Sequence, residues 1–404
     1  MSLVAEKSRL STMASQMSES ETLKMAQMAR NLKAEGHDVI SLSIGEPDFD
    51  TPDHIKMAAI KALSEGFTKY TPVVGIPDLL TAISKKFKRD NNLDYAPNQI
   101  MVSTGAKQSI FNVAFSLLEE GDECIILAPY WVSYADIIKM TGATPVYVSA
   151  GFEQGYKVTA EQIEDAITER TKMVLFSSPC NPSGAVFTKS ELSNIADVLG
   201  KYEDIYIVSD EIYEYINYTK SGHTSIGSFP AVKDRTITVN GFAKGFSMTG
   251  WRLGYIGAPK FVIEACNKIQ GQSTSGANSF SQKAAVVALN SPLDATYKMR
   301  DEFRVRRDIV VGLLSEIEGF KVPMPEGAFY VFPDISDIFG KSDGTTVIKN
   351  ADDFCDYIMQ NVYVGLVSGA AFGEPNCFRL SYAASEAQLR EAIRRIKSVC
   401  DTLK

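Results

Sequence analysis

The sequence lacks the features of a membrane-bound, secreted or nucleic-acid-binding protein. No apolar run approaches the roughly 20 residues that a membrane-spanning helix needs. The opening MSLVAEKSRLSTMASQ has early charge but no apolar core, unlike a secretory signal. No block of five or more basic residues occurs and the formal net charge is −8, which disfavours nucleic-acid binding. We therefore expect a soluble globular protein of the cytoplasm that binds neither membranes nor nucleic acids.

Residues that bind metals or form disulfides are also few. The three histidines, His37, His54 and His223, lie far apart in the sequence and give little support for a metal site or a catalytic triad. The six cysteines form no CxxC pair, and we expect them to be reduced and mostly buried. They are Cys124, Cys180, Cys266, Cys355, Cys377 and Cys400.

The 404 residues are enough for a large and a small domain with sizeable cores. Between about residues 100 and 257, short apolar runs alternate with helical patterns, which predicts a mostly parallel sheet covered by helices. Thr188 and Glu191 have the spacing of a capping box that begins one of these helices. The expected strands are residues 100–105, 124–129, 143–148, 171–177, 204–210 and 236–240.

A second region follows the long charged helical pattern of residues 295–316. In it, GAFYVF and FRLSYA are typical of strands, and Ser385 with Gln388 predicts the start of a closing helix. The N-terminal residues carry one helical pattern and no core of their own. We predict a large α/β domain (46–295), a smaller α+β domain (296–404) and an N-terminal segment (1–45) that joins the smaller domain.

The stretch TVNGFAKGFSMTGWRLGYIG sets Lys244 among glycines and apolar residues, with Arg252 eight positions later. A desolvated lysine loses proton affinity, and its free amine becomes a nucleophile for carbonyl carbons. The planar fork of Arg252 suits phosphate oxygens. An amine and a phosphate clamp are what an enzyme needs to hold pyridoxal phosphate as a Schiff base. A loop lysine alone is more often a solvated surface residue, so this interpretation depends on the rest of the chain.

Polar residues follow three of the expected strands, where ligands collect in α/β sheets. Gly105, Ala106 and Lys107 stand at the start of a helix, which suits a phosphate, although an ordinary turn would have the same sequence. Asp210 could keep the pyridine nitrogen of the cofactor protonated, or cap a helix. Asn181, in SSPCNPSGAVF, could donate to the phenolic oxygen of the cofactor, or belong to a plain turn.

Eight segments in order resemble the motifs of the class I (fold-type I) aminotransferases, over nearly the whole chain. They are IGEPDFDTP, YTPVVGIPDL, TGAKQ, APYWVSY, NPSGAVF, SDEIYE, the Lys244 stretch and FRLSYA. The resemblance is greatest to the bacterial aspartate aminotransferase branch. It implies a large domain with a mostly parallel, seven-stranded sheet flanked by helices and a smaller domain built from both termini. It also implies a homodimer with active sites at the subunit interface.

The resemblance assigns five residues to the ring of pyridoxal 5′-phosphate. Lys244 forms the Schiff base and, once released by substrate, carries the proton between Cα and the cofactor carbon. Asp210 pairs with the pyridinium, while Tyr213 and Asn181 reach the phenolic oxygen. Trp131 stacks on the ring. Trp131 and Asn181 are also expected to contact the substrate.

The phosphate of the cofactor is assigned to Gly105, Ala106 and Arg252, with Tyr70 reaching it from the partner subunit. One position departs from the pattern of many relatives, which carry serine or threonine three residues before the lysine. This chain has Gly241 there, so the phosphate loses one hydroxyl donor. A hydrogen bond to a charged group contributes about 1.5–3 kcal/mol.

The substrate is assigned to residues at both ends of the site. Arg379 binds the substrate α-carboxylate as a bidentate pair, assisted by the backbone of Gly45. The segment GQSTSGANSFSQ has no arginine for a distal carboxylate, and the bacterial branch uses a lysine of the phosphate turn and an N-terminal threonine instead. The matching residues are Lys107, which also borders the cofactor, and Thr22. Lys107 could alternatively be a solvated lysine at a helix start.

The resemblance implies ping-pong transamination of L-aspartate with 2-oxoglutarate, giving oxaloacetate and L-glutamate. A prephenate or aromatic aminotransferase stays open, since prephenate-using enzymes of the same branch look alike in these motifs. A pyridoxal-phosphate C–S β-lyase would share every cofactor residue. A regulator fused to a DNA-binding domain is disfavoured, because there is no basic N-terminal domain.

Overall fold

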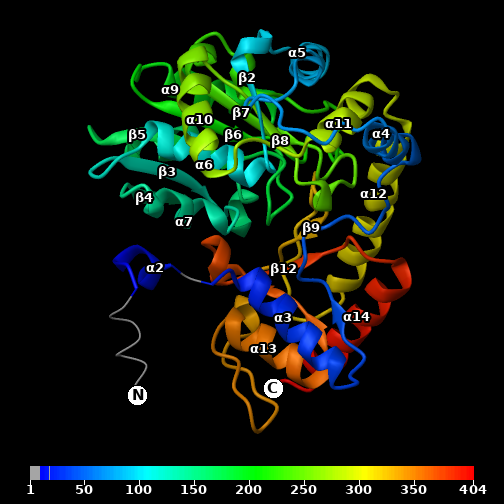
Figure 1. Cartoon of the computed structure of the whole chain (residues 1–404). Helices are drawn as coiled ribbons and strands as arrows, with labels where there is room; N and C mark the ends of the chain where they lie inside the picture. The colour runs from blue at the N-terminus through cyan, green and yellow to red at the C-terminus, as the bar shows by residue number, and fades with distance from the viewer. Residues whose placement is uncertain (1–9, 18) are drawn as a thin grey trace.

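The computed structural model describes residues 10–17 and 19–404. It consists of a larger body built on one sheet and a smaller body that contains the segments near both termini (Figure 1). The helices are α2 (Thr12–Gln16), α3 (Glu21–Ala34), α4 (Asp53–Ser64), α5 (Pro77–Asn91), α6 (Ala106–Leu117), α7 (Ser133–Met140), α8 (Ala160–Ala166), α9 (Lys189–Leu199), α10 (Lys260–Ser273), α11 (Ser279–Asn290), α12 (Asp294–Leu314), α13 (Ala351–Val362) and α14 (Glu386–Cys400).

A seven-stranded sheet with the order β2-β8-β7-β6-β5-β3-β4 forms the centre of the larger body. Its strands are β2 (Ile100–Ser103), β3 (Glu123–Ala128), β4 (Thr144–Ser149), β5 (Thr171–Ser177), β6 (Tyr206–Asp210), β7 (Thr236–Gly241) and β8 (Gly254–Gly257). The neighbours from β7 to β4 are parallel, whereas β8 is antiparallel to both β7 and β2. The prediction of a mostly parallel seven-stranded sheet flanked by helices is confirmed, and the six expected strands lie within two residues of their predicted bounds.

Strand β8 was not among the strands predicted from the sequence. Its four residues, GYIG, are too short and too rich in glycine to show a strand pattern. Both glycines are required by close approach, because a Cβ at Gly254 would collide with the backbone of Ala106 and one at Gly257 with the ring of Tyr95. This packing holds the start of α6 against the first residue of β8.

Helices cover both faces of the sheet because its strands alternate apolar side chains between two cores. Ile126 and Leu175 face α6, α7 and α10, whereas Ile125 and Val174 face α8 and α9. A third core lies between β2, β8 and the helices α4, α5 and α11. The predicted capping box of α9 is confirmed, with both reciprocal hydrogen bonds formed. The six cysteines are free and buried, as expected.

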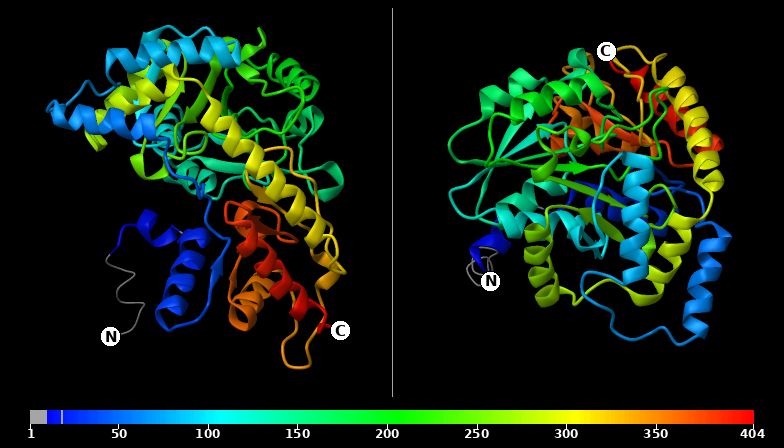
Figure 2. Two further views of the ribbon diagram at one scale, coloured as in Figure 1. Left: turned by 90° about the vertical axis from the view of Figure 1, so that its right-hand side faces the viewer. Right: turned by 90° about the horizontal axis from the view of Figure 1, so that it is seen from above.

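The smaller body joins segments from the two ends of the chain. Strand β1 (Ile40–Ser41) pairs with β10 (Val364–Gly365), and an antiparallel sheet has the order β11 (Val367–Ser368), β12 (Phe378–Ser381), β9 (Tyr330–Val331). Helix α12 begins beside the larger body and ends against α14 (Figure 2). The division at residues 45 and 295 stays a prediction, which these contacts support.

One detail of the N-terminal segment was wrong. We expected one helical pattern, but the segment has a short helix α2 before α3. Helix α2 has five residues, fewer than a periodic pattern needs, and a hydrogen bond to the side chain of Ser11 caps its start. Within the described part of the chain, no helix combines the length and apolarity that crossing a membrane requires.

Candidate active site

A cavity of about 480 Å³ opens between the larger and smaller bodies, at the carboxyl ends of β5 and β6. It brings together every residue that the sequence analysis assigned to the site, except Tyr70. They are Thr22, Gly45, Gly105, Ala106, Lys107, Trp131, Asn181, Asp210, Tyr213, Lys244, Arg252 and Arg379.

Lys244 follows β7 and borders the cavity. Its Nζ donates a hydrogen bond to the carbonyl oxygen of Gly45 and lies 5.7 Å from the centre of the Tyr213 ring. Burial lowers the pKa of Lys244 to about 8, and the positive charges of Arg379 and Arg252 act in the same direction. A sizeable fraction of this amine is therefore neutral near pH 8 and able to act as a nucleophile or base.

Asp210 is the last residue of β6 and is 4% exposed. Its carboxylate accepts hydrogen bonds from the Tyr134 hydroxyl at 2.7 Å and from the backbone N–H of Ile212 at 3.2 Å. Burial raises the pKa of Asp210 to about 6, although both hydrogen bonds favour the charged form. Near neutral pH this is a buried carboxylate whose ionised form a cationic ring nitrogen would stabilise.

Tyr134 was not among the site residues predicted from the sequence. It lies on α7, three residues after Trp131, and the two rings meet edge to face with their centres 5.6 Å apart. A buried tyrosine on an apolar helix face is usually a core residue, so its bond to Asp210 does not follow from the helical pattern. Its position in the APYWVSY motif was the one available signal.

Tyr330 was also missed, because GAFYVF was interpreted only as a strand. The hydroxyls of Tyr330 and Tyr213 lie 2.6 Å apart, and the two residues come from the two bodies. Burial raises the pKa of both phenols, so both stay protonated at neutral pH. A Cβ at Gly45 would collide with the Tyr330 hydroxyl, which explains the glycine in the IGEPDFDTP motif.

Arg379, on β12, is a buried cation that forms no ion pair within the described residues. One terminal nitrogen donates to Asn181 Oδ1 at 2.9 Å and the other to the carbonyl oxygen of Ser43 at 2.5 Å. Its Nε has no hydrogen-bond partner in the part of the chain that the structure describes. Burial lowers the pKa of Arg379. An entering carboxylate would supply the missing charge and acceptor.

The start of α6 forms a cradle for an anion. Gly105 has φ +86°, and a Cβ there would come within 2.5 Å of an Arg252 terminal nitrogen. The other terminal nitrogen of Arg252 donates to the carbonyl oxygen of Thr249 at 3.0 Å. Free backbone N–H groups at a helix start, a guanidinium and the space left by glycine together fit a phosphate monoester. These residues, with Lys244 and Asp210, fit pyridoxal phosphate.

Gly241 does not line the cavity. A Cβ at this position would come within 3.0 Å of the side chain of Ile212 and of the carbonyl oxygen of Leu253. The packing around β7 therefore leaves little room for the serine or threonine of other relatives.

Lys107 borders the cavity, and its Nζ lies 4.9 Å from the centre of the Trp131 ring. Burial lowers the pKa of Lys107, and the charge of Arg252 adds to the effect. The Lys107 side chain is nevertheless exposed, so the alternative interpretation of a solvated lysine at a helix start stays open. Thr22, on α3, lines the same cavity from the N-terminal side.

Tyr70 is 97% exposed and lies away from the cavity of its own chain. It borders a surface hollow formed by residues 68–71 and 274–279. Its assigned contact with the phosphate therefore needs a second subunit and stays a prediction.

Comparison with known proteins shows what this chain is similar to. Residues 37–396 match the family model described as aminotransferase class I and II. The chain is 47% identical over 383 residues to the aspartate/prephenate aminotransferase of Cereibacter sphaeroides, which covers 94% of this chain and 96% of that protein.

Two solved structures have the same fold. The aspartate aminotransferase from Rhizobium meliloti superposes with a TM-score of 0.95 at 43% identity, covering 98% of this chain and 99% of that one. The aspartate aminotransferase from Thermus thermophilus with maleate gives a TM-score of 0.91 at 39% identity, covering 96% and 99% of the two chains.

Replacing Asp210 by asparagine should stabilise the ligand-free protein at about pH 8. The pKa of this carboxyl is about 6 in the fold against an ordinary 3.8. Its favourable contribution is therefore complete below about pH 4 and is lost as the pH rises through 6. The loss corresponds to roughly 3 kcal/mol of unfolding free energy. Urea unfolding at several pH values measures it.

The stabilisation by Asp210→Asn should shrink steadily as the pH is lowered from about 8 to about 5. Asp401→Asn, at an exposed residue of the C-terminal turn, is the control and should change little. A destabilised Asp210→Asn protein at the higher pH would contradict the assigned burial cost.

Proposed function

The chain belongs to the class I and II aminotransferase family and is therefore an aminotransferase; from that premise we propose that its substrates are L-aspartate and 2-oxoglutarate, which give oxaloacetate and L-glutamate. One observation carries the proposal. The cavity has a buried arginine, Arg379, that forms no ion pair with the described residues, and a second cation, Lys107, with the amine of Lys244 in the same cavity. A dicarboxylic amino acid presents a carboxylate to each cation and its α-amino group to the site of chemistry.

We propose that pyridoxal 5′-phosphate is the cofactor of this site. When bound, it carries the amino group and withdraws electrons from the substrate Cα. The support is the match between its three polar ends and the anion cradle of α6, the buried carboxylate at the end of β6 and the desolvated amine after β7. The proposed contacts are Gly105, Ala106 and Arg252 with the phosphate, Asp210 with the ring nitrogen, Asn181 and Tyr213 with the phenolic oxygen, Trp131 with the ring face and Lys244 with the aldehyde carbon, while Lys107 borders the cofactor.

The proton at the substrate Cα is assigned to Lys244. Its pKa of about 8, lowered by burial and by the charge of Arg379, leaves a useful fraction of neutral amine to accept that proton. The carbonyl oxygen of Gly45 fixes the position of Nζ through a hydrogen bond. Arg379 orients the substrate by its α-carboxylate. Asp210 stabilises the positive charge of the ring nitrogen.

Preference for acidic substrates is assigned to Lys107, with Thr22 in the lining of the same cavity. The segment of residues 271–282 has no arginine that could take this role. Prephenate is a second candidate substrate, because the relative from Cereibacter sphaeroides is named an aspartate/prephenate aminotransferase. Prephenate also carries two carboxylates, so both readings use the same two cations.

We propose that two copies of the chain form a homodimer in which the partner subunit's Tyr70 completes the phosphate site. The nearby helix α4 leaves Met57, Ile60 and Leu63 exposed, at 59%, 55% and 44%. Apolar side chains exposed together mark surfaces that a partner covers. A cytoplasmic location, expected from the sequence, also stays a prediction.

Lys244→Ala should abolish the visible absorbance of the bound cofactor and lower turnover of aspartate at least about 1,000-fold, because the amine that holds the cofactor and moves the proton is lost. Absorbance spectra and a coupled oxaloacetate assay measure both effects. Lys260→Ala, at an exposed lysine that starts α10, is the matched control. Retention of absorbance and turnover by the Lys244 variant would refute the assignment.

Lys107→Ser should lower kcat/KM for aspartate by roughly tenfold to a hundredfold, the value of one charge-assisted hydrogen bond. The value for phenylalanine should change much less, because phenylalanine has no distal carboxylate. Steady-state kinetics with both donors test this, and Lys139→Ser on the exposed side of α7 is the control. Equal losses on the two donors would rule out the role in selectivity.

A mixed dimer tests the shared site. Tyr70→Ala and Lys244→Ala chains, co-expressed with different tags and purified through both, should give dimers with one intact site of two. Such dimers should have about half of the wild-type activity at limiting cofactor, although each variant alone is nearly inactive. Activity no higher than that of the Tyr70→Ala dimer would place both residues in one chain and exclude the proposed arrangement.

A further inference from the structure

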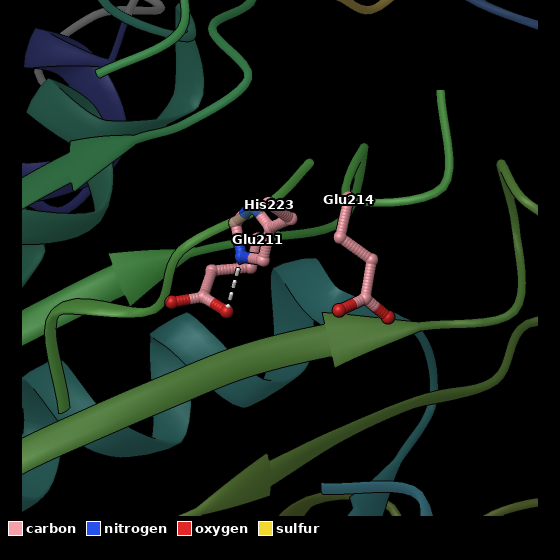
Figure 3. A group of neighbouring side chains, drawn as sticks. All are labelled: Glu211, Glu214 and His223. Atoms are coloured by element: carbon pink, nitrogen blue, oxygen red, sulfur yellow. Dashed lines mark hydrogen bonds and ion pairs between the residues drawn. The ribbon is translucent and has the colours of Figure 1, made fainter. Parts of the chain in front are cut away.

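A network of buried charges includes the residues next in the chain to Asp210 and Tyr213. Glu211 and Glu214 belong to the same short segment after β6 and are 1% and 6% exposed. Figure 3 shows Glu211 hydrogen-bonded to His223, with the carboxylate of Glu214 nearby. None of these three side chains lines the cavity.

Both carboxylate oxygens of Glu211 have hydrogen-bond partners. Its Oε2 accepts hydrogen bonds from Ser225 Oγ at 2.6 Å and Asn91 Nδ2 at 3.3 Å, and lies 2.8 Å from His223 Nε2. Its Oε1 accepts from Ser209 Oγ at 3.0 Å. These partners come from α5, from β6 and from the loop before residue 226. The network therefore ties three separate segments to the residue that follows Asp210.

Glu214 is paired with a lysine that has no exposed surface. Lys86 Nζ forms an ion pair with Glu214 Oε1 and donates to Asn91 Oδ1 at 2.6 Å. The other oxygen of Glu214 accepts from Asn91 Nδ2 at 2.7 Å. The lysine, two glutamates and the asparagine thus form one connected unit.

With both carboxylates ionised, the charges of this unit balance when His223 is protonated. Two carboxylates and Lys86 leave one negative charge, and unpaired buried charges are costly. Burial alone would lower the pKa of His223, but Glu211 and Glu214 outweigh burial and raise it, while Lys86 opposes them. The imidazolium then supplies the second positive charge.

Further ionisable groups surround the unit and do not change this balance. Asp90 and Arg89 pair with each other at the end of α5. Burial raises the pKa of Tyr95, Tyr215 and Tyr255, so these phenols are neutral.

A metal ion is the alternative occupant, because ligand atoms of Glu211, Glu214 and His223 lie within 4.8 Å of one another. The ammonium of Lys86 and the amide of Asn91 already occupy the Glu214 carboxylate. Three donors besides His223 occupy that of Glu211. A metal would have to displace a buried cation, so the structure favours an ion network without metal.

We propose that Lys86, Asn91, Glu211, Glu214 and His223 form a charge-balanced network that positions Asp210 and Tyr213 for the cofactor ring. The inference rests on the function proposed above, which gives those two residues their role. The connection is short, because Glu211 adjoins Asp210, and the backbone N–H of Glu214 donates to the carbonyl oxygen of Glu211 at 2.9 Å. Tyr213 lies inside that turn.

The network also has an electrostatic effect on the site. The negative charge of Glu211 contributes to the raised pKa of Asp210, after the larger effect of burial. A protonated His223 offsets the charge of Glu211 and so helps Asp210 remain ionised. Loss of that proton would favour the neutral form of Asp210, the proposed partner of the ring nitrogen, although no residue of the cavity lining would change.

The test compares His223→Gln with the double variant Glu211→Gln/His223→Gln, in which both charges of the pair are removed. His223→Gln should weaken pyridoxal phosphate binding roughly tenfold and lower kcat more than it changes KM for aspartate, as loss of a supporting contact does. The double variant should recover to within about threefold of wild type, since no unpaired carboxylate remains. His54→Gln, at an exposed histidine, is the control.

Two further measurements do not depend on the catalytic activity of a variant. The cofactor-free protein has three histidine imidazoles. In NMR spectra, the His223 imidazole is the signal that is absent from the double variant Glu211→Gln/His223→Gln. Its pKa should lie above the ordinary value of about 6.5. Metal analysis of the wild-type protein should find no stoichiometric ion. Should His223→Gln fail to fold, this titration and the cofactor affinity of the double variant decide.

The proposed network would be refuted if His223→Gln kept the cofactor affinity and kcat of the wild type, or if the double variant were as impaired as the single one. A His223 imidazole that titrates below 6.5 would also refute it, as would a bound metal ion that is lost when His223 is replaced. These outcomes differ from failure of the proposed function, in which the wild-type protein itself would neither bind pyridoxal phosphate nor transaminate aspartate.

Discussion

The withdrawal of the Lys244 ammonium from water is the interaction on which the site depends. The Lys244 ammonium donates a hydrogen bond to the carbonyl oxygen of Gly45. The guanidinium groups of Arg252 and Arg379 add positive charge around this ammonium. The buried carboxylate of the cavity, Asp210, resists ionisation because it is buried. The cavity therefore has an excess of positive charge. Anionic ligands relieve that excess, which is the physical reason why a phosphate and two substrate carboxylates suit it.

The fold produces this arrangement at the cost of stability. Parallel strands deliver Asp210, and the loop after β7 delivers Lys244, to the same edge of the sheet, while β12 brings Arg379 from the smaller body. Each group is held by its neighbours, such as Tyr134 on Asp210 and Asn181 on Arg379. Groups whose pKa values are shifted by burial oppose folding, so the hydrophobic cores on both sheet faces must offset them.

Much of this could be predicted from the sequence, because strand-end residues lie in recognisable motifs. The residues missed share a physical reason. Tyr134 and Tyr330 lie in apolar segments that indicate core residues, and their hydroxyls form hydrogen bonds to residues far away in the sequence. Lys86 and Glu214 are charged residues that would normally be solvated, and only packing shows that they are buried together. Distance along the chain was a poor guide for His223, which lies against Glu211. The role of Tyr70 depends on a second subunit, which one sequence does not describe.

The most direct test of the central claim is reductive trapping. Borohydride reduction of the protein with one equivalent of pyridoxal phosphate, followed by peptide mapping, should find one pyridoxyl group per chain, on Lys244. The pH dependence of labelling should have a midpoint near the lowered pKa of about 8. Label spread over exposed lysines, with Lys244 unmodified, would contradict the account.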